Sequence, residues 1–230
     1  QSTERQSVLG HFIDAQEYVI RRHKEIRLND FSSDNRKKIV IIGDSHSEDL
    51  VNAVFEAGLD AEFEFSSFYI PVRCGVLFVQ NRPIIGREST CGRFSFYDEE
   101  LQNLIKVADQ VWVISSWKES HLVFIQKSIK NLVSLNEDLV IFGTKNFGRV
   151  SELWYSNNLV EAWASKEFSQ SEIDELEIKS KINKAIAEMS HEEGVKFLNP
   201  QHLICEELEY CSNFTSGGII SHDGDHLTPH

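Results

Sequence analysis

Residues 37–47 read KKIVIIGDSHS, and this stretch decides the fold. Its centre, residues 39–42, is an unbroken apolar run that is mostly β-branched and has no polar alternation. Such runs are typical of strands that helices bury on both faces of a parallel sheet. Gly43 permits a tight turn after the strand, and the polar residues that follow it are common where helices begin. We therefore predict a buried strand, a turn and a helix here.

Strands and helices continue to alternate along the rest of the chain. The other predicted strands are Ala61–Tyr69, Gln110–Ser115, Leu139–Gly143 and Val195–Leu198. The predicted helices are Ser47–Ala57, Tyr97–Val107, Lys118–Ser134 and most of residues 150–193, with a long ordered loop at 71–97 and irregular chain after Asn199. This pattern predicts an α/β fold, in which a doubly wound parallel sheet forms the middle of three α/β/α layers, as in flavodoxin. We expect residues 1–36 to be a helical arm with a linker, and residues 37–230 to form one domain.

Composition excludes some classes of partner. The 230 residues carry a formal net charge of −13, and phosphate binding needs a basic patch, so we expect no nucleic-acid partner. No apolar run reaches the ~18 residues that span a bilayer. The N-terminal residues also lack the apolar core of a signal peptide, so we expect any export to be directed from outside this chain. The glycines of P-loop and dinucleotide motifs are missing, and we expect no cofactor.

Four cysteines form two local pairs, Cys74 with Cys91 and Cys205 with Cys211. Neither pair has the CxxC spacing of a zinc or redox site. An even count in local pairs suggests two disulfides and an oxidising compartment. Four unrelated buried thiols would fit the same spacing.

Ser45 is the candidate nucleophile. Ligands of open α/β sheets bind beyond the carboxyl ends of the strands, and Ser45 directly follows the first predicted strand. The free N–H groups and the dipole of a helix N-terminus favour negative charge there. Alternatively, Ser45 and Glu48 fit the S-x-x-E capping box, in which the serine only caps the helix.

Asp223 and His226 can complete a catalytic triad. A serine hydroxyl needs a base to take its proton, and that base needs an orienting carboxylate. The offset between the two residues lets Asp223 reach the His226 ring across one turn. Two alternatives remain: the stretch HDGDH at 222–226 is rich in metal-ligand types, although its spacing is not standard, or it is a polar terminal loop.

Together these motifs resemble a known superfamily. Ile42-Gly43-Asp44-Ser45-His46 after the first strand, with Asp223-x-x-His226-Leu227-Thr228 near the end, resembles the SGNH (GDSL-like) hydrolases. The resemblance is closest to the periplasmic SGNH domain fused to acyltransferase-3 membrane proteins, which are O-acetyltransferases of bacterial surface polysaccharides. It implies Ser45 as nucleophile, His226 as base and Asp223 as its partner. Both cysteine pairs are also similar to that subfamily.

The resemblance also suggests where an oxyanion would be held. SGNH enzymes use a glycine after the second strand and an asparagine after the third, beside the N–H of the serine. Gly75 occupies the first place here, while Ser115-Ser116-Trp117-Lys118 replaces the asparagine block, and the subfamily tends to have tryptophan there. We therefore expect the backbone N–H groups of Ser45 and Gly75 to contribute, together with Trp117. Alternatively, Gly75 is a turn residue beside Cys74, and Trp117 packs in the core.

The resemblance implies an O-acetyltransferase domain that passes an acyl group through acyl-Ser45 to a hydroxyl of a surface polysaccharide. Its partners would be a glycan acceptor and a multi-span acyltransferase-3 membrane domain in the same or a neighbouring chain, which places it in the periplasm as part of an inner-membrane protein. Arg73, Arg82, Arg87 and Trp117 would line an acceptor groove, unless the arginines are solvated surface charges. The alternatives are a carbohydrate O-acetyl esterase and a non-catalytic glycan-binding module, against which the intact triad argues.

Overall fold

A computed structural model describes residues 17–79, 91, 98–147, 170–205, 214–215, 218–221 and 226–227. Its centre is one five-stranded sheet in the order β2-β1-β3-β4-β5, and every pair of neighbours is parallel. The strands are β1 (Lys37–Gly43), β2 (Phe63–Tyr69), β3 (Gln110–Ile114), β4 (Leu139–Phe142) and β5 (Lys196–Leu198). The prediction of a doubly wound α/β fold is thereby confirmed. None of the described helices is both long and apolar enough to span a bilayer.

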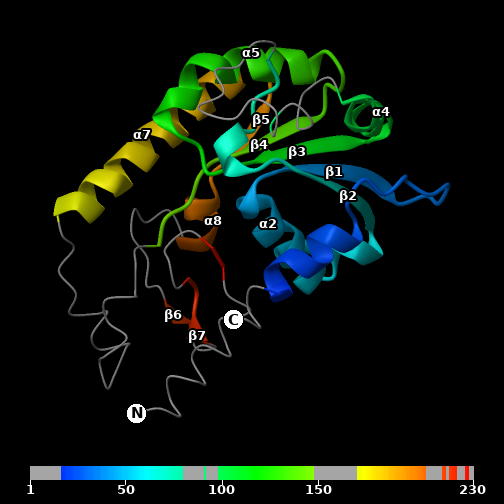
Figure 1. Cartoon of the computed structure of the whole chain (residues 1–230), viewed down its shortest axis with the longest axis horizontal. Coiled ribbons are helices and arrows are strands. Elements are labelled where there is room, and N and C mark those ends of the chain that lie inside the picture. The colour runs from blue at the N-terminus through cyan, green and yellow to red at the C-terminus, as the bar shows by residue number, and fades with distance from the viewer. Residues whose placement is uncertain are drawn as a thin grey trace.

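Helices cover the sheet on both faces (Figure 1). One face carries α4 (Glu99–Val107), α5 (Leu122–Val133) and α7 (Gln170–Glu192), and the opposite face carries α2 (Ser45–Glu56). The chain runs from β1 outward to β2 and then returns across β1 to β3, so the strand order reverses between β1 and β3. Ligands of doubly wound sheets bind at such a reversal, beyond the carboxyl ends of the strands.

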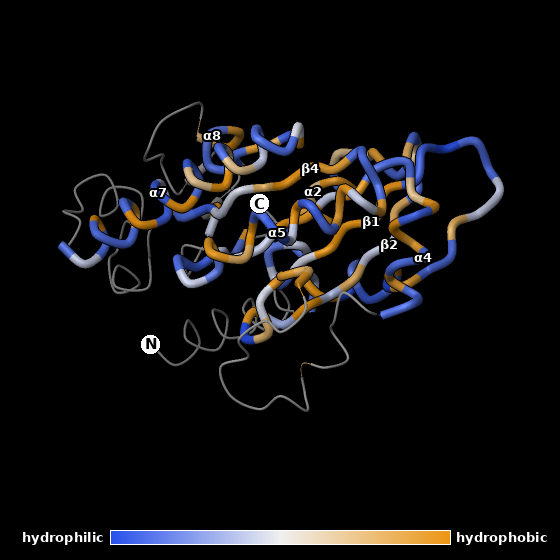
Figure 2. The backbone as a smooth tube through the Cα atoms, turned by 90° about the horizontal axis from the view of Figure 1, so that it is seen from above, coloured by the Kyte–Doolittle hydropathy of each residue, from blue (hydrophilic) through white to orange (hydrophobic). Residues whose placement is uncertain are grey.

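The apolar run in β1 is unbroken because helices cover both faces of the sheet. Ile39 and Ile41 pack with Val51 and other residues on the α2 side. Val40 and Ile42 belong to the larger cluster on the other face. These four residues of β1 are fully buried, and Figure 2 shows β1 and β4 as largely hydrophobic, whereas β2 is more mixed.

Several element bounds differ from the prediction. α2 begins at Ser45 rather than Ser47, and the helix predicted over Lys118–Ser134 is a 3₁₀ turn, η4 (Glu119–His121), followed by α5. The chain after Asn199 is not all irregular. It contains the short helix α8 (Pro200–Cys205) and the two-residue strands β6 (Phe214–Thr215) and β7 (Gly218–Ile219).

The predicted N-terminal arm packs onto the domain. Residues 17–25 are helical, and Arg27 then forms a parallel bridge with Ser67 at the outer edge of β2. His23 is buried, and its Nε2 lies 3.1 Å from Ser47 Oγ on α2. Burial and the nearby charge of Arg27 lower the pKa of His23 to about 4. A neutral ring therefore joins the arm to the first turn of α2 at neutral pH.

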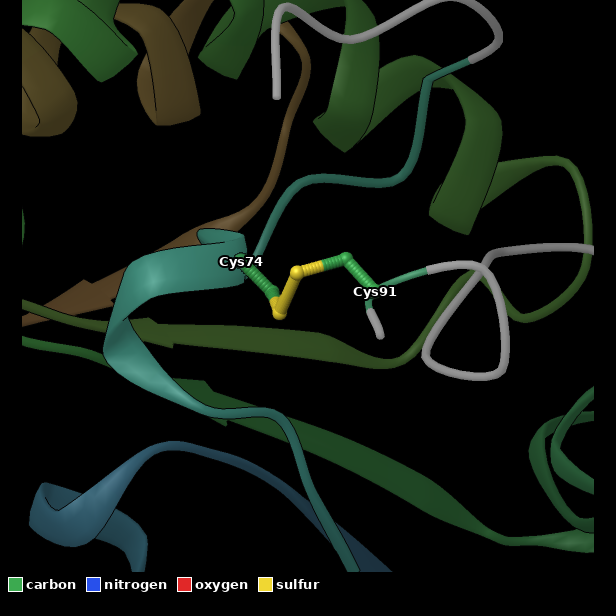
Figure 3. The surroundings of a disulfide bond; sticks show 2 residues. All are labelled: Cys74 and Cys91. Carbon is green, nitrogen blue, oxygen red and sulfur yellow. A yellow bond between two sulfur atoms is a disulfide. The ribbon is translucent and has the colours of Figure 1, made fainter. Parts of the chain in front are cut away.

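One predicted disulfide is confirmed. Cys74 is bonded to Cys91, with 5.5 Å between their Cα atoms, and the bond ties the 3₁₀ turn η2 (Val72–Cys74) to the far end of the predicted loop (Figure 3). Cys205 is also disulfide-bonded, while its predicted partner Cys211 lies outside the described residues.

Replacing both Cys74 and Cys91 with serine is expected to lower the free energy of unfolding by about 3 kcal/mol, because the unfolded chain regains the entropy of a closed loop. Urea denaturation of the non-reduced double variant and wild type measures this difference. Equal unfolding midpoints, or mass spectrometry finding four free thiols in the wild type, would contradict the bond.

Candidate active site

Gly43 brings the start of α2 against the end of β3. A Cβ atom at this position would collide with the carbonyl oxygen of Ile114 and lie only 2.7 Å from Ser47 Cβ. Only a residue without a side chain fits between these groups. Residues directly after Gly43 are therefore held at the carboxyl ends of β1 and β3.

Asp44, not Ser45, caps α2. Its Oδ1 accepts a hydrogen bond of 3.0 Å from the backbone N–H of His46. The predicted alternative of a capping box from Ser45 to Glu48 is therefore wrong, because Ser45 is already the first helical residue and its side chain is not needed at the cap. Within the described part of the chain, the backbone N–H of Ser45 has no acceptor, so it is one of the unsatisfied donors of a helix N-terminus.

The same Asp44 carboxyl group joins α2 to β3. Its Oδ2 accepts hydrogen bonds from Ser115 Oγ at 2.6 Å and from the backbone N–H of Ser116 at 2.9 Å. Burial raises the pKa of Asp44, while these two bonds and the one from His46 oppose that rise. Sequence reasoning did not single out Asp44 beyond its motif, although aspartate is a preferred N-cap residue.

Ser45 and His226 are far apart in the sequence and lie side by side in the structure. His226 Nε2 lies 2.7 Å from Ser45 Oγ, and both side chains are half-buried. A neutral imidazole at this distance can accept the hydroxyl proton and activate the serine oxygen. The structure thus brings two residues of the predicted triad together, while Asp223 lies outside the described residues.

His226 is surrounded by groups that sequence reasoning missed. The backbone N–H of the next residue, Leu227, donates to Asp49 Oδ2 at 3.2 Å. The same oxygen forms a 2.7 Å ion pair with Lys145 Nζ, in which both side chains are 2% exposed. The buried ring of His46 lies edge-on to the His226 ring, with 5.9 Å between the centroids. Burial first, and then the positive charge of Lys145, lowers the pKa of His46 well below 6.5, so its ring is neutral.

Glu48 adds a second carboxyl group beside the site. Burial, followed by the negative charge of Asp49, raises the pKa of Glu48 to about 7, and the charge of His226 acts in the opposite direction. At neutral pH this group therefore carries only part of a negative charge.

Two of the predicted oxyanion donors, Gly75 and Trp117, make hydrogen bonds elsewhere. Gly75 has a φ of +64°, which favours glycine, and its N–H donates to the carbonyl oxygen of Val72. Trp117 donates through Nε1 to the carbonyl oxygen of Phe142 at 2.8 Å and through its backbone N–H to Ser115. Trp117 is only 3% exposed and belongs to the core cluster, so the expectation that it lines an acceptor groove is wrong. An oxyanion role for Gly75 and Trp117 stays a prediction, and the unsatisfied N–H of Ser45 is the donor that the described geometry offers.

The predicted groove and the metal alternative fall largely on residues that are not described. Arg73 is exposed, while Arg82 and Arg87 lie outside the described ranges. Of the stretch HDGDH, only His226 is described. Among the residues that the structure covers, no three His, Cys, Asp or Glu side chains are grouped to hold a metal ion.

The comparison with protein families gives a match over most of the chain. The profile described as "SGNH domain (fused to AT3 domains)" matches residues 15–230. The chain belongs to this family. The match begins at residue 15, so it includes the docked helix at 17–25. Membership makes this chain an SGNH-type enzyme, and the chemistry it supports is acyl transfer or ester hydrolysis.

Two solved structures were found to be similar to this chain. The periplasmic domain of the lipopolysaccharide acetyltransferase of Salmonella ser. Paratyphi A has a TM-score of 0.56 at 15% identity, covering 91% of this chain and 90% of that one. The extracellular lipase of Streptomyces rimosus has a TM-score of 0.45 at 12% identity, covering 84% and 93%. The first likeness confirms the SGNH fold. No curated protein sequence matches the chain significantly.

Proposed function

We propose that this SGNH domain is an O-acyltransferase that passes an acyl group, an acetyl group in the simplest case, through Ser45 to a sugar hydroxyl of a bacterial surface polysaccharide. The observation that carries the proposal is the 2.7 Å contact between His226 Nε2 and Ser45 Oγ at the N-terminus of α2. The catalytic set is Ser45, His226 and Asp223, with Asp223 orienting the imidazole.

The first half-reaction forms acyl-Ser45. His226 Nε2 takes the hydroxyl proton as Ser45 Oγ attacks the carbonyl carbon of an acyl ester, giving a tetrahedral oxyanion. The Ser45 N–H and the positive end of the α2 dipole stabilise that negative charge. When the bond to the leaving group breaks, the imidazolium returns the proton to the departing oxygen.

The second half-reaction releases the acyl group to an acceptor. His226 removes the proton of a sugar hydroxyl as its oxygen attacks acyl-Ser45. Collapse of the second tetrahedral species forms the O-acyl sugar, and the proton goes back to Ser45 Oγ. The proton balance closes without a cofactor.

The family description supports the choice of partner and compartment. SGNH domains of this family are described as fused to AT3 domains, and the similar Salmonella structure is the periplasmic domain of a lipopolysaccharide acetyltransferase. We therefore propose an acyltransferase-3 membrane domain, in the same or a neighbouring chain, as the source of acyl groups, a periplasmic location, and a glycan as acceptor.

The second candidate is a carbohydrate O-acetyl esterase. Ser45 and His226 are only half-buried, which leaves water a path to acyl-Ser45. A transferase must orient its acceptor well enough to outcompete ~55 M water, and oriented groups reach effective molarities of about 10⁵–10⁸ M. The two functions differ only in which oxygen attacks second.

Product analysis separates transfer from hydrolysis. The chain is given p-nitrophenyl acetate together with a panel of oligosaccharides, and acetylated sugar and free acetate are followed by mass spectrometry. We expect slow acetate release, and acetylated sugar that rises when membranes containing the acyltransferase-3 partner are added. Efficient deacetylation of an acetylated glycan, with no acetylated sugar under any acceptor, would make the protein an esterase.

A further inference from the structure

Asp49 connects three parts of the chain that are distant in sequence. It lies on α2 about one turn after Ser45 and is 3% exposed. Its Oδ2 accepts from Lys145 Nζ, which follows β4, and from the backbone N–H of Leu227. One buried oxygen therefore holds both the end of the sheet and the segment that carries His226.

The bond to Leu227 fixes the place of His226 relative to Ser45. Leu227 is the next residue after His226, so an anchored Leu227 N–H restricts the backbone from which the imidazole extends. Asp49, which accepts the Leu227 N–H, and Ser45, the nucleophile, lie on the same helix about one turn apart. The 2.7 Å contact between Ser45 and His226 is therefore made close to the point where the His226 segment is held. The buried His46 ring, also on α2, packs edge-on against the His226 ring.

Lys145 holds the Asp49 carboxylate in place. Its ammonium group lies 2.7 Å from Asp49 Oδ2, and its own carbonyl oxygen accepts from Lys179 Nζ at 3.2 Å. A carboxylate taken out of water needs an opposite charge with good geometry. Lys145 supplies that charge from the carboxyl end of the sheet, where the site lies.

We propose that Asp49 is a positioning residue that, held by Lys145, fixes His226 against Ser45 through the Leu227 N–H. The effect on turnover rests on the proposed function of the Ser45 site, whereas the effect on Leu227 does not. Asp49 touches no reacting atom, so its loss should lower kcat more than it changes KM.

Two double variants isolate the hydrogen bond from the charges. Asp49→Asn with Lys145→Met removes both charges but keeps an oxygen that accepts from Leu227. Asp49→Leu with Lys145→Met removes both charges and the acceptor. On p-nitrophenyl acetate we expect the leucine variant to lose up to about 10²-fold in kcat, since small misplacements of a catalytic group have effects of that size, with KM changed little. The asparagine variant should keep most of the rate.

Hydrogen exchange of the Leu227 amide, followed by NMR, gives a readout that needs no turnover. The amide should be protected in the wild type and the asparagine variant and exchange faster in the leucine variant. If wild type acylates no Ser45, the proposed function fails while this exchange comparison still decides the positioning role. Equal exchange in both variants, or equal kcat where the wild type is active, overturns the inference. If the leucine variant does not fold, Asp49→Ala with Lys145→Met makes the same comparison without added bulk.

Discussion

Replacing Ser45 with alanine is expected to lower turnover of an activated acetyl ester by roughly 10⁴–10⁶-fold, the range seen when the nucleophile of a serine triad is removed. No acyl-enzyme can form without Oγ, and His226 loses the hydroxyl that lies 2.7 Å from its Nε2. Steady-state rates with p-nitrophenyl acetate measure the loss. Mass spectrometry of both proteins after mixing with the ester shows whether an acetyl group is attached to Ser45 in the wild type and is missing from the variant.

Ser47→Ala is the matched control for this variant. Ser47 lies on the same turn of α2, but its hydroxyl is buried and donates to the backbone oxygen of Asp44. We expect it to lose some stability and to turn over the ester at close to the wild-type rate. Activity that survives Ser45→Ala and disappears with EDTA would instead favour the metal alternative at residues 222–226.

Local pattern was enough to predict the sheet. The β-branched run in β1 has no polar alternation because Ile39 and Ile41 face one core cluster while Val40 and Ile42 face the other. The start of α2 was harder, since Asp44 and Ser45 are both residue types that cap helices. In the structure Ser115 and Ser116 donate to the Asp44 side chain and hold it at the cap position. Contacts between residues so far apart in sequence cannot be predicted from the local pattern.

Only those residues of the site that belong to a known sequence motif could be predicted. Ser45 and His226 were found because the GDSH and DxxH blocks resemble a known pair. Asp49 and Lys145 are separated by 96 positions, and nothing in the sequence near either one predicts their ion pair. Gly75 shows the limit of a positional argument: its place after β2 suits an oxyanion donor, and only the structure shows that its N–H also donates to Val72 within the η2 turn.

The ion pair should also dominate the stability of this region. Lys145→Met alone is expected to lower the free energy of unfolding by about 3–5 kcal/mol, because it leaves the Asp49 carboxylate buried without its counter-charge. Both side chains are 2% exposed in the pair, so solvent cannot replace the ammonium group without local opening. Urea denaturation at neutral pH measures the loss, provided the slope of the transition is unchanged.

Asp49→Asn combined with Lys145→Met serves as the control for that value. Removing both charges takes away the ion pair and also the cost of an isolated buried charge, and such neutral replacements are often close to the wild type in stability. We therefore expect the double variant to recover most of the loss, a coupling that residues in direct contact commonly show. A double variant that unfolds as readily as Lys145→Met would mean that the methylene stem of Lys145, rather than its charge, holds this part of the core.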